Sequence, residues 1–541
     1  MREIIKRLMG LTVLGGILCP PGLAAQDSSG SWRDFDCVRG SEVWLTGYNA
    51  SGLFRLPEAV QRISFAQVSA IKNNGDFVNF YQSNNSYTFG AQTESFYRMS
   101  PKVVVYGKME YRNFTGQNMG GAAFIDPYYH LFNFIEVSQK NTGEKNFERY
   151  HLVGAVGARI TSRFSMGAKI DYLAANYTKH KDLRHENNML DLTATAGAAF
   201  SLNVLDLGVN YIYRRSVESI KFQRFGTTDL LYSNLIDFGA FYGRTQLFGE
   251  SGYTRTEKTP VFNQFQGVAL QLKWNIRSNL TLFNEFSYLL RSGYYGNASA
   301  GNNLICYSEH DGNEMAYSGV VSLSQNQNQH LLSLNFRQEQ LSNFENIYRR
   351  ENDPEAGRTT IVYYGNNKVL DRTRMTAGIE YTGRLQIEDY CPKWEFKAGG
   401  NYTNRAQTVS LFPYYRKQDI FFWNAYLKAD RRITVRKNQY GMALGLLYGA
   451  GGGNMNTDGL YATPSEDSRQ PYSSEYHLQN EYEYLTAGRV TINMGVSYAR
   501  MIRPKVRGYV RLVYEFTNAL QVEHLAGSQF HGVQLSVGCG F

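Results

Sequence analysis

Long apolar runs and prolines are both scarce in this sequence. Beyond the N-terminus no stretch reaches roughly 18 apolar residues, which excludes membrane-spanning helices from most of the chain. Charged residues make up only 19 % and apolar residues 43 %, which excludes the composition of a disordered chain. Proline accounts for 12 of 541 residues, whereas there are 51 Gly, 40 Tyr and 32 Phe. This composition indicates β architecture.

The N-terminus has the features of an exported protein. Three basic residues among the first seven precede an apolar stretch from Leu8 to Leu18, and two prolines end that stretch before Ala24-Ala25. This pattern predicts a signal peptide over residues 1–25. Cys19 would suit a lipoprotein, but the bulky Leu18 before it favours simple cleavage over lipidation.

The net charge and the cysteine content bear on possible binding partners, metal sites and disulfides. The formal net charge of +9 is modest for this length and forms no basic clusters, so we expect no nucleic-acid partner. Four cysteines remain after the predicted cleavage, and none has metal-binding spacing. They could pair in an oxidising compartment in three ways, among which the sequence does not choose. They are Cys37, Cys306, Cys391 and Cys539.

Short segments of alternating apolar and polar residues recur along the chain. Between Arg163 and Tyr172, for example, apolar side chains occupy every second position. Because successive side chains of a strand point to opposite faces, each such segment has one apolar and one polar side. The pattern is also present in 107–112, 149–160, 190–198, 205–214, 268–276, 374–384, 394–405 and 506–516.

The connections between these segments differ in length. Short links and long polar ones both occur, which is the pattern of an outer-membrane barrel with short turns at one end and long loops at the other. The predicted short links include 100–101, 161–162, 277–279 and 486–488, and the predicted long loops are 115–146, 174–187, 292–312, 338–371 and 450–474.

The C-terminal segment supports a barrel. Val533 to Phe541 alternates and ends in an aromatic residue, which resembles the closing strand of Gram-negative outer-membrane barrels. A strand facing lipid cannot leave backbone groups unpaired, so the sheet must close. We therefore predict an all-β protein, a transmembrane antiparallel up-and-down β-barrel with an even number of strands, about 16–20. Between Tyr213 and Gln266 only one strand is evident, Ile236 to Tyr242, where the up-and-down order requires two or none. The number of strands is therefore left as a range.

The alternation also assigns residues to the two sides of the wall. Ala168 and Leu207 are predicted to face lipid. Charged residues of both signs are predicted to line the lumen, either as structural ion pairs or as the lining of a pore. Their basic excess favours a weak anion preference if the barrel conducts. They are Lys108, Glu110, Arg112, Arg149, Arg159, Lys169, Asp171, Arg214, Lys273, Arg374, Glu380, Arg507 and Arg511.

Residues 26–60 precede the first strand, and residues 61–541 are assigned to the barrel. The N-terminal segment is too short for a domain, and we expect it to plug the lumen or lie in the periplasm. Trp44 with Asn49–Leu53, then Gly167–Tyr172 and Lys181–Arg184, resembles an uncharacterised family of outer-membrane β-barrels from Gram-negative anaerobes. The resemblance implies partnership with TonB-dependent receptors in envelope uptake or surface display, and it carries over no functional residue.

Common catalytic and cofactor motifs are absent from the sequence. It contains no P-loop, HExxH, GxSxG, EF-hand loop or CxxC pair. Gly449–Gly453 is predicted to be a flexible loop, and His151, His330 and His477 are predicted to be ordinary lumen residues. We therefore expect no cofactor, no metal site and no enzymatic activity.

Three functions remain open. The first is a channel or substrate-uptake barrel in contact with outer-membrane lipid and lipopolysaccharide. The second is a non-conducting binding or assembly partner of a TonB-dependent receptor or secretion complex. The third, which no sequence feature favours, is a hydrolase embedded in the barrel, with catalytic residues distant in sequence.

Overall fold

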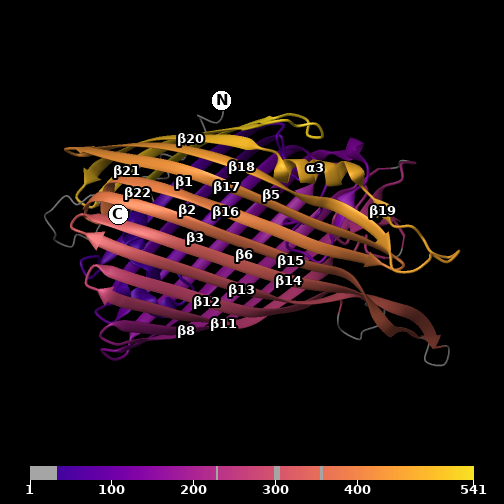
Figure 1. Ribbon diagram of the computed structural model, residues 1–541, viewed down its shortest axis with the longest axis horizontal. Coiled ribbons are helices and arrows are strands. Elements are labelled where there is room, and N and C mark those ends of the chain that lie inside the picture. Colours follow the sequence, from indigo (N-terminus) through magenta and orange to yellow (C-terminus); the bar gives the residue numbers. More distant parts are fainter. Residues whose placement is uncertain (1–32, 227–228, 251, 298–304, 354–357) are drawn as a thin grey trace.

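The wall of the molecule is a single closed sheet of eighteen antiparallel strands (Figure 1). The computed structural model describes residues 33–226, 229–250, 252–297, 305–353 and 358–541, so the predicted signal peptide lies outside the described residues. Each wall strand pairs with its neighbours in chain order, and β1 pairs with β22 to close the ring, with Val68 opposite Val537. The prediction of an up-and-down barrel with 16–20 strands is confirmed.

The wall strands are β1 (Arg62–Gly75), β2 (Asn85–Ser100), β3 (Val103–Met119), β5 (Gly143–Arg159), β6 (Phe164–Lys179), β7 (Arg184–Ser201), β8 (Leu205–Gln223), β11 (Thr259–Arg277), β12 (Leu280–Gly296), β13 (Cys306–Gln325), β14 (Asn328–Asp353), β15 (Arg358–Glu388), β16 (Cys391–Leu411), β17 (Tyr414–Val435), β18 (Asn438–Leu460), β20 (Arg489–Arg503), β21 (Val506–Ala519) and β22 (Gln529–Gly540). Among the described residues no helix is long and apolar enough to cross a membrane.

Alternation along the strands separates the two faces of the wall as predicted. On β8, Leu207 is 46 % exposed on the outside, whereas its neighbour Asp206 is 4 % exposed on the inside. Met166 and Ile170 of β6 are likewise exposed. The outer face is thus apolar, and the inner face is polar, because successive side chains of a strand point to opposite sides.

The two ends of the barrel differ. At one end, which we name the turn end, eight connections of two to four residues join the strands, at 101–102, 160–163, 202–204, 278–279, 326–327, 389–390, 436–437 and 504–505. At the other end, the loop end, longer connections include 76–84, 120–142, 224–258, 461–488 and 520–528.

The predicted strand Ile236 to Tyr242 is not part of the wall. It covers the end of β9 (Ser233–Asp237), a turn, and the start of β10 (Tyr242–Leu247). With β4 (Asn133–Glu136) and β19 (Tyr472–Ser473), these strands form a separate four-stranded sheet. Removing this segment from the wall makes the strand count even, and the connection after β21 is simply a loop.

Several predicted connections are also wrong. Residues 486–488 join α3 (Glu475–Thr486) to β20 rather than two strands of a hairpin. Gly449–Gly453 lies inside β18, and much of the predicted loop 338–371 belongs to β14 and β15. The predicted loops 115–146, 174–187, 292–312 and 450–474 also include strand residues at their ends. Strands continue past the apolar band, where both faces meet water and the alternation that marked them disappears.

Candidate functional site

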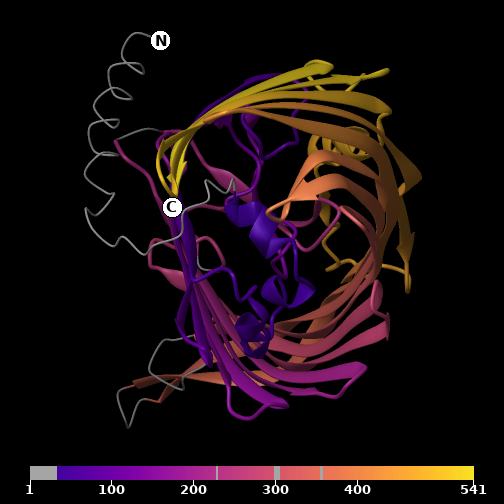
Figure 2. The same cartoon turned by 90° about the vertical axis from the view of Figure 1, so that its left-hand side faces the viewer.

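The lumen holds the N-terminal residues at its turn end. Figure 2 shows their short helices, in indigo, inside the ring of strands. We call residues 33–60 the plug; it contains α2 (Phe35–Arg39) and the 3-10 helices η1 (Val43–Leu45) and η2 (Ala50–Arg55). A cluster of buried apolar residues joins the plug to the wall, namely Phe35, Val38, Leu45, Ala50, Leu53, Leu56, Val60, Ile63, Phe96 and Val104.

Glycines in the wall allow η2 to approach closely. A Cβ atom on Gly167 would lie 2.3 Å from the carbonyl carbon of Ala50, and one on Gly157 would lie 2.4 Å from the Ala50 oxygen. Neither distance can be tolerated, because real Cβ atoms essentially never lie within 3.0 Å of other heavy atoms. Asn49 also reaches the wall, since its Nδ2 donates to Gln271 Oε1 at 3.0 Å. The inner face of the wall is therefore shaped for this segment.

Ion pairs anchor the plug at several points of the ring. Asp34 contacts Arg507 at 2.5 Å and Glu42 contacts Lys273 at 2.9 Å. Arg55 binds Asp206 at 2.8 Å, on β8, where Asp206 lies directly opposite Lys273 of β11. Burial alone would raise the pKa of Asp34, but the guanidinium groups of Arg507 and Arg432 outweigh burial and lower that pKa below its ordinary value.

The loop end of the lumen is filled by the four-stranded sheet, the residues around it and α3, which we call the cap (residues 120–137, 233–247 and 472–486). Its core packs against the inner face of the wall and is rich in aromatic residues. The cluster that joins the cap to the wall includes Phe124, Phe132, Phe134 and Phe238 of the cap, Tyr253 beside it, and Tyr295, Leu341, Val369 and Val409 of the wall.

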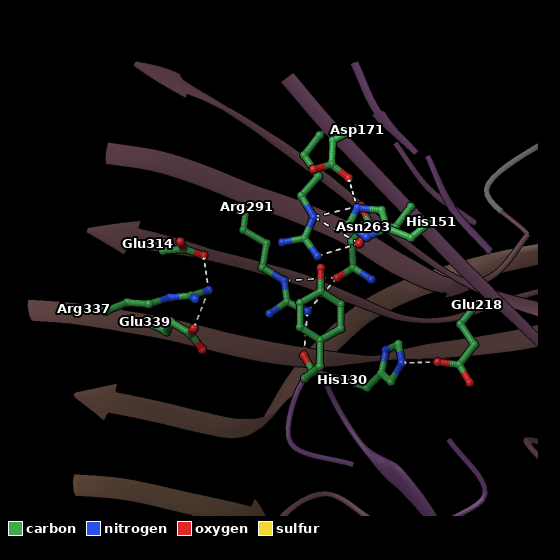
Figure 3. Close-up of polar contacts among 12 residues, drawn as sticks. His130, His151, Asp171, Glu218, Asn263, Arg291, Glu314, Arg337 and Glu339 are labelled. Carbon is green, nitrogen blue, oxygen red and sulfur yellow. Dashed lines mark hydrogen bonds and ion pairs between the residues drawn. The ribbon is translucent and has the colours of Figure 1, made fainter. Parts of the chain in front are cut away.

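Wall side chains hold one cap segment by its backbone. Arg291 donates to the Tyr129 carbonyl at 2.9 Å, Arg372 to the His130 carbonyl at 3.1 Å, and Asn343 to the Leu131 carbonyl at 3.1 Å. The His130 ring lies 2.6 Å from Glu218, and Arg291 also binds Asn263 (Figure 3). Three successive carbonyls are thus bound by side chains from β12, β14 and β15.

Asp237 and His477 are buried titratable groups of the cap whose pKa values are shifted. Burial raises the pKa of Asp237 to about 7, although the backbone N–H groups of Gly239 and Tyr242 donate to its carboxylate. Burial lowers the pKa of His477 to about 4. Both groups are therefore neutral over part of the pH range in which an exposed counterpart is charged.

A cavity of about 220 Å³ lies between the plug and the wall. Tyr48 of the plug reaches it, and the rest of its lining comes from β12 to β16. Arg337 stands beside it and pairs with Glu314 and Glu339, each at 2.8 Å (Figure 3). The lining residues are Tyr48, Glu285, Ser287, Ala316, Tyr317, Ser318, Asn335, Phe336, Arg337, Thr376, Gly378 and Asn401.

The charged residues predicted for the lumen occupy inward positions of the wall strands. Lys273 and Arg507 bind the plug, and Arg159 lies over the Phe54 ring of the plug at 5.8 Å. Glu380 accepts a hydrogen bond from the Tyr426 hydroxyl at 2.6 Å. The inward positions of Arg149, Lys169, Arg374 and Arg511 follow from the alternation of their strands.

The remaining predicted residues form local ion pairs. Glu110 contacts Lys108 at 2.8 Å and Arg112 at 2.5 Å along one strand. Between strands, His151 binds Asp171 at 2.7 Å (Figure 3), and Arg214 binds Asp191 at 2.6 Å. The structure brings these residues together in pairs rather than in one charged ring of a single sign.

One histidine lies on another face than predicted, and a second lies in the lumen on a helix of the cap rather than on a wall strand. His330 sits on the outer face of β14 and stacks on Tyr381, whose hydroxyl lies 2.8 Å from its Nδ1. His477 belongs to α3, where it packs against Phe80 and Phe241. The alternation pattern assigned His330 to the wrong face of its strand. His477 lies in a helix, which has no two-residue period, so the pattern does not apply to it.

The sequence does not indicate the contacts to the cap. Nothing in a wall strand marks which inward residue will meet a folded loop, and Arg291, Asn343 and Arg372 are such residues. Within the described ranges, no group of three or more His, Cys, Asp or Glu is arranged to hold a metal ion.

Comparison with curated proteins gives no match. Among solved structures, the chain is similar to BauA, the ferric preacinetobactin receptor of Acinetobacter baumannii, with 9 % identity, a TM-score of 0.40, and coverage of 88 % of this chain and 80 % of that one. It is similar to OccAB4 of Acinetobacter baumannii, with 8 % identity, a TM-score of 0.35, and coverage of 89 % and 98 %. The outer-membrane transporter YddB of Escherichia coli gives 7 % identity, a TM-score of 0.37, and coverage of 88 % and 80 %.

One family matches over nearly the whole chain, from residue 55 to residue 541. The match begins in η2 of the plug and includes every strand of the wall. The chain therefore belongs to the family of unknown function DUF6850.

Proposed function

We propose that this protein is a gated transport barrel of the Gram-negative outer membrane, in contact with lipid and lipopolysaccharide. Its exposed apolar outer face and polar inner face suit a wall between lipid and water. The observation that carries the proposal is the cavity of about 220 Å³ between the plug and the wall, whose lining is largely apolar but includes Glu285 and Arg337. A small solute with an apolar body and a polar group is the class of substrate that such a lining would take.

The contacts that close the lumen suit a removable closure. The plug is held by ion pairs such as Asp34–Arg507 and Glu42–Lys273 as well as by apolar packing. Ion pairs can exchange for water without disturbing the strand pairing of the wall. The predicted lumen residues Lys273 and Arg507 would therefore serve as plug anchors, and the other predicted residues would set the charge of the path.

Single-channel recording in planar bilayers tests the proposal. The double variant Asp34→Asn, Glu42→Gln removes two plug anchors while leaving the wall unchanged. We expect a higher open probability than in the wild type. Asp36→Asn is the matched control, because Asp36 pairs with Arg39 inside the plug at 2.9 Å.

Equal conductance behaviour of the double variant and the control would contradict a gate at the plug. The experiment needs both proteins folded, which heat-dependent migration in detergent gels would establish before recording.

A second candidate function is supported by the hairpin of β14 and β15. Its strands have 26 and 31 residues, and beyond Glu345 and Leu370 they no longer pair with β13 and β16. On this extension Tyr363 and Tyr364 are exposed. Such a surface would suit docking to a TonB-dependent receptor or secretion complex.

Co-purification tests the docking candidate. A Tyr363→Ser, Tyr364→Ser variant should lose a receptor that the wild type retains in mild detergent. Retention of the same receptor by the variant would contradict docking through the hairpin.

A further inference from the structure

Two cysteines distant in sequence meet where the plug contacts the wall. Cys37 lies in α2 of the plug, and Cys391 is the first residue of β16, beside the turn at 389–390. Both are buried, and their thiol groups form a hydrogen bond with each other. A hydrogen bond between two thiols places their sulfurs side by side, from where a small adjustment can bring them to the ~2 Å of a disulfide.

The surroundings of this pair favour thiol chemistry. Arg432 Nη1 lies 2.9 Å from Cys37 Sγ. The hydrogen bond with Cys391 and burial raise the pKa of the Cys37 thiol in the docked plug, and the Arg432 guanidinium partly offsets this by stabilising a thiolate, the form of cysteine that attacks a disulfide. Nearby, Arg384 Nη1 donates to the Gly40 carbonyl at 2.8 Å, which holds the end of α2 against β15. The contact between the sulfurs is thus supported by the polar contacts around it.

We propose that Cys37 and Cys391 form a disulfide that fastens the plug to the wall. Of the six pairs that four cysteines can form, this one joins residues already in contact. Cys306 lies at the opposite, loop end, where its Sγ donates to the Ser308 carbonyl at 3.6 Å. The pairing depends on the fold and on export, but it does not depend on transport.

The oxidant is the disulfide of a periplasmic dithiol carrier. One cysteine thiolate attacks the carrier disulfide, forms a mixed disulfide and releases one carrier thiolate. The second cysteine thiolate then attacks the protein sulfur of the mixed disulfide and releases the other carrier thiolate. Two protons leave the cysteines and two electrons pass to the carrier. Because both cysteines are buried once α2 is seated, the exchange takes place while the plug docks.

The disulfide would change what the ion pairs of the plug can do. The anchors at Asp34, Glu42 and Arg55 break and reform reversibly, whereas a disulfide keeps α2 attached when they break. Residues after α2 could then leave the wall while the beginning of the plug stays in place. The bond would therefore fix one end of any movement of the plug.

Mass spectrometry of the wild-type protein tests the pairing. Outer membranes are dissolved in denaturant with excess iodoacetamide and no reductant, and the protein is then digested. We expect a peptide in which Cys37 is linked to Cys391, together with carbamidomethylated Cys306. After reduction and labelling with N-ethylmaleimide, Cys37 and Cys391 should carry the second label. Iodoacetamide on both Cys37 and Cys391 in the first step would overturn the proposal.

Limited proteolysis tests the fastening. Cleavage within the plug, at Arg39, should be several-fold faster in Cys37→Ser and Cys391→Ser than in the wild type, and the reduced wild type should behave like these variants. Cys306→Ser is the matched control and should match the wild type. Equal cleavage rates in all of these proteins, with their barrels folded by heat-dependent migration, would show that the bond does not hold the plug.

Discussion

A charge placed on the outer face of the wall gives the most direct test of where lipid lies. Ala168 of β6 is exposed and lies four residues beyond Phe164, the first residue of the strand at the turn end. At about 3.3 Å per residue and a tilt of about 40°, this places Ala168 about 10 Å into an apolar band roughly 25 Å tall. Ala168→Arg should therefore lie close to the midplane and destabilise the folded protein in lipid by about 2–4 kcal/mol.

Two control substitutions differ from Ala168→Arg in their depth in the apolar band or in the face of the wall on which they lie. Leu207 lies only two residues beyond Leu205, the start of β8, so Leu207→Arg should cost about 0–1 kcal/mol. Ala316→Arg makes the same substitution as at Ala168, but on the inner face beside the cavity, where water can solvate the charge. We expect that variant to stay within about 1 kcal/mol of the wild type.

Urea titration of protein folded into lipid vesicles measures these differences. Tryptophan fluorescence and heat-dependent migration should report the same transition in each variant. If Ala168→Arg were as stable as the wild type, or if Ala316→Arg were equally destabilised, the assignment of the outer face to lipid would be wrong.

Three further predictions concern the contents of the lumen. Because the pKa of Asp34 is lowered in the folded protein, its pairing with Arg507 stabilises the plug fully above the ordinary pKa of 3.8. This stabilisation is lost as the pH falls through the folded-state pKa, so proteolysis of the plug should accelerate below about pH 4. Because burial raises the pKa of Asp237 to about 7, keeping this carboxyl buried costs stability as the pH rises from 3.8 towards 7. In denaturant titrations, Asp237→Asn should therefore stabilise the cap above pH 7, by roughly 4 kcal/mol at most, and should make no difference at pH 3.5. Gly167→Ala should displace η2 and cost about 1–3 kcal/mol, whereas Gly154→Ala, which has nothing within 4 Å, should be neutral in the same titrations; equal effects of the two would contradict the close approach of Ala50.

The wall could be predicted from the sequence because lipid and water impose a two-residue period on it. Segments such as 163–172 and 205–214 carry that period clearly, and the structure has them as β6 and β8. The period fails where both faces meet water, so the outer parts of β14, β15 and β18 looked like loops. It also misassigned His330, which meets Tyr381 at the edge of the apolar band rather than the lumen.

The contents of the lumen could be predicted only in outline. The strands of the cap have two to six residues, and the contacts that hold them lie on side chains of distant wall strands. Nothing in the sequence near Arg291 or Arg372 indicates that its partner is a backbone carbonyl of the segment 129–131. Pairing of the cysteines is a similar case, because Cys37 and Cys391 become neighbours only once the ring has closed around the plug.

The seam of the ring, where β1 meets β22, has a consequence for biogenesis. The plug is joined directly to β1, so it is tethered beside the seam before the last strand arrives. Pairing of Val68 with Val537 then seals a cylinder whose contents are already in place. The insertion machinery must therefore accept a partly closed sheet that already contains the plug. Weakening the contacts between the wall and the plug should delay the pairing of β1 with β22 while leaving the closed barrel unchanged.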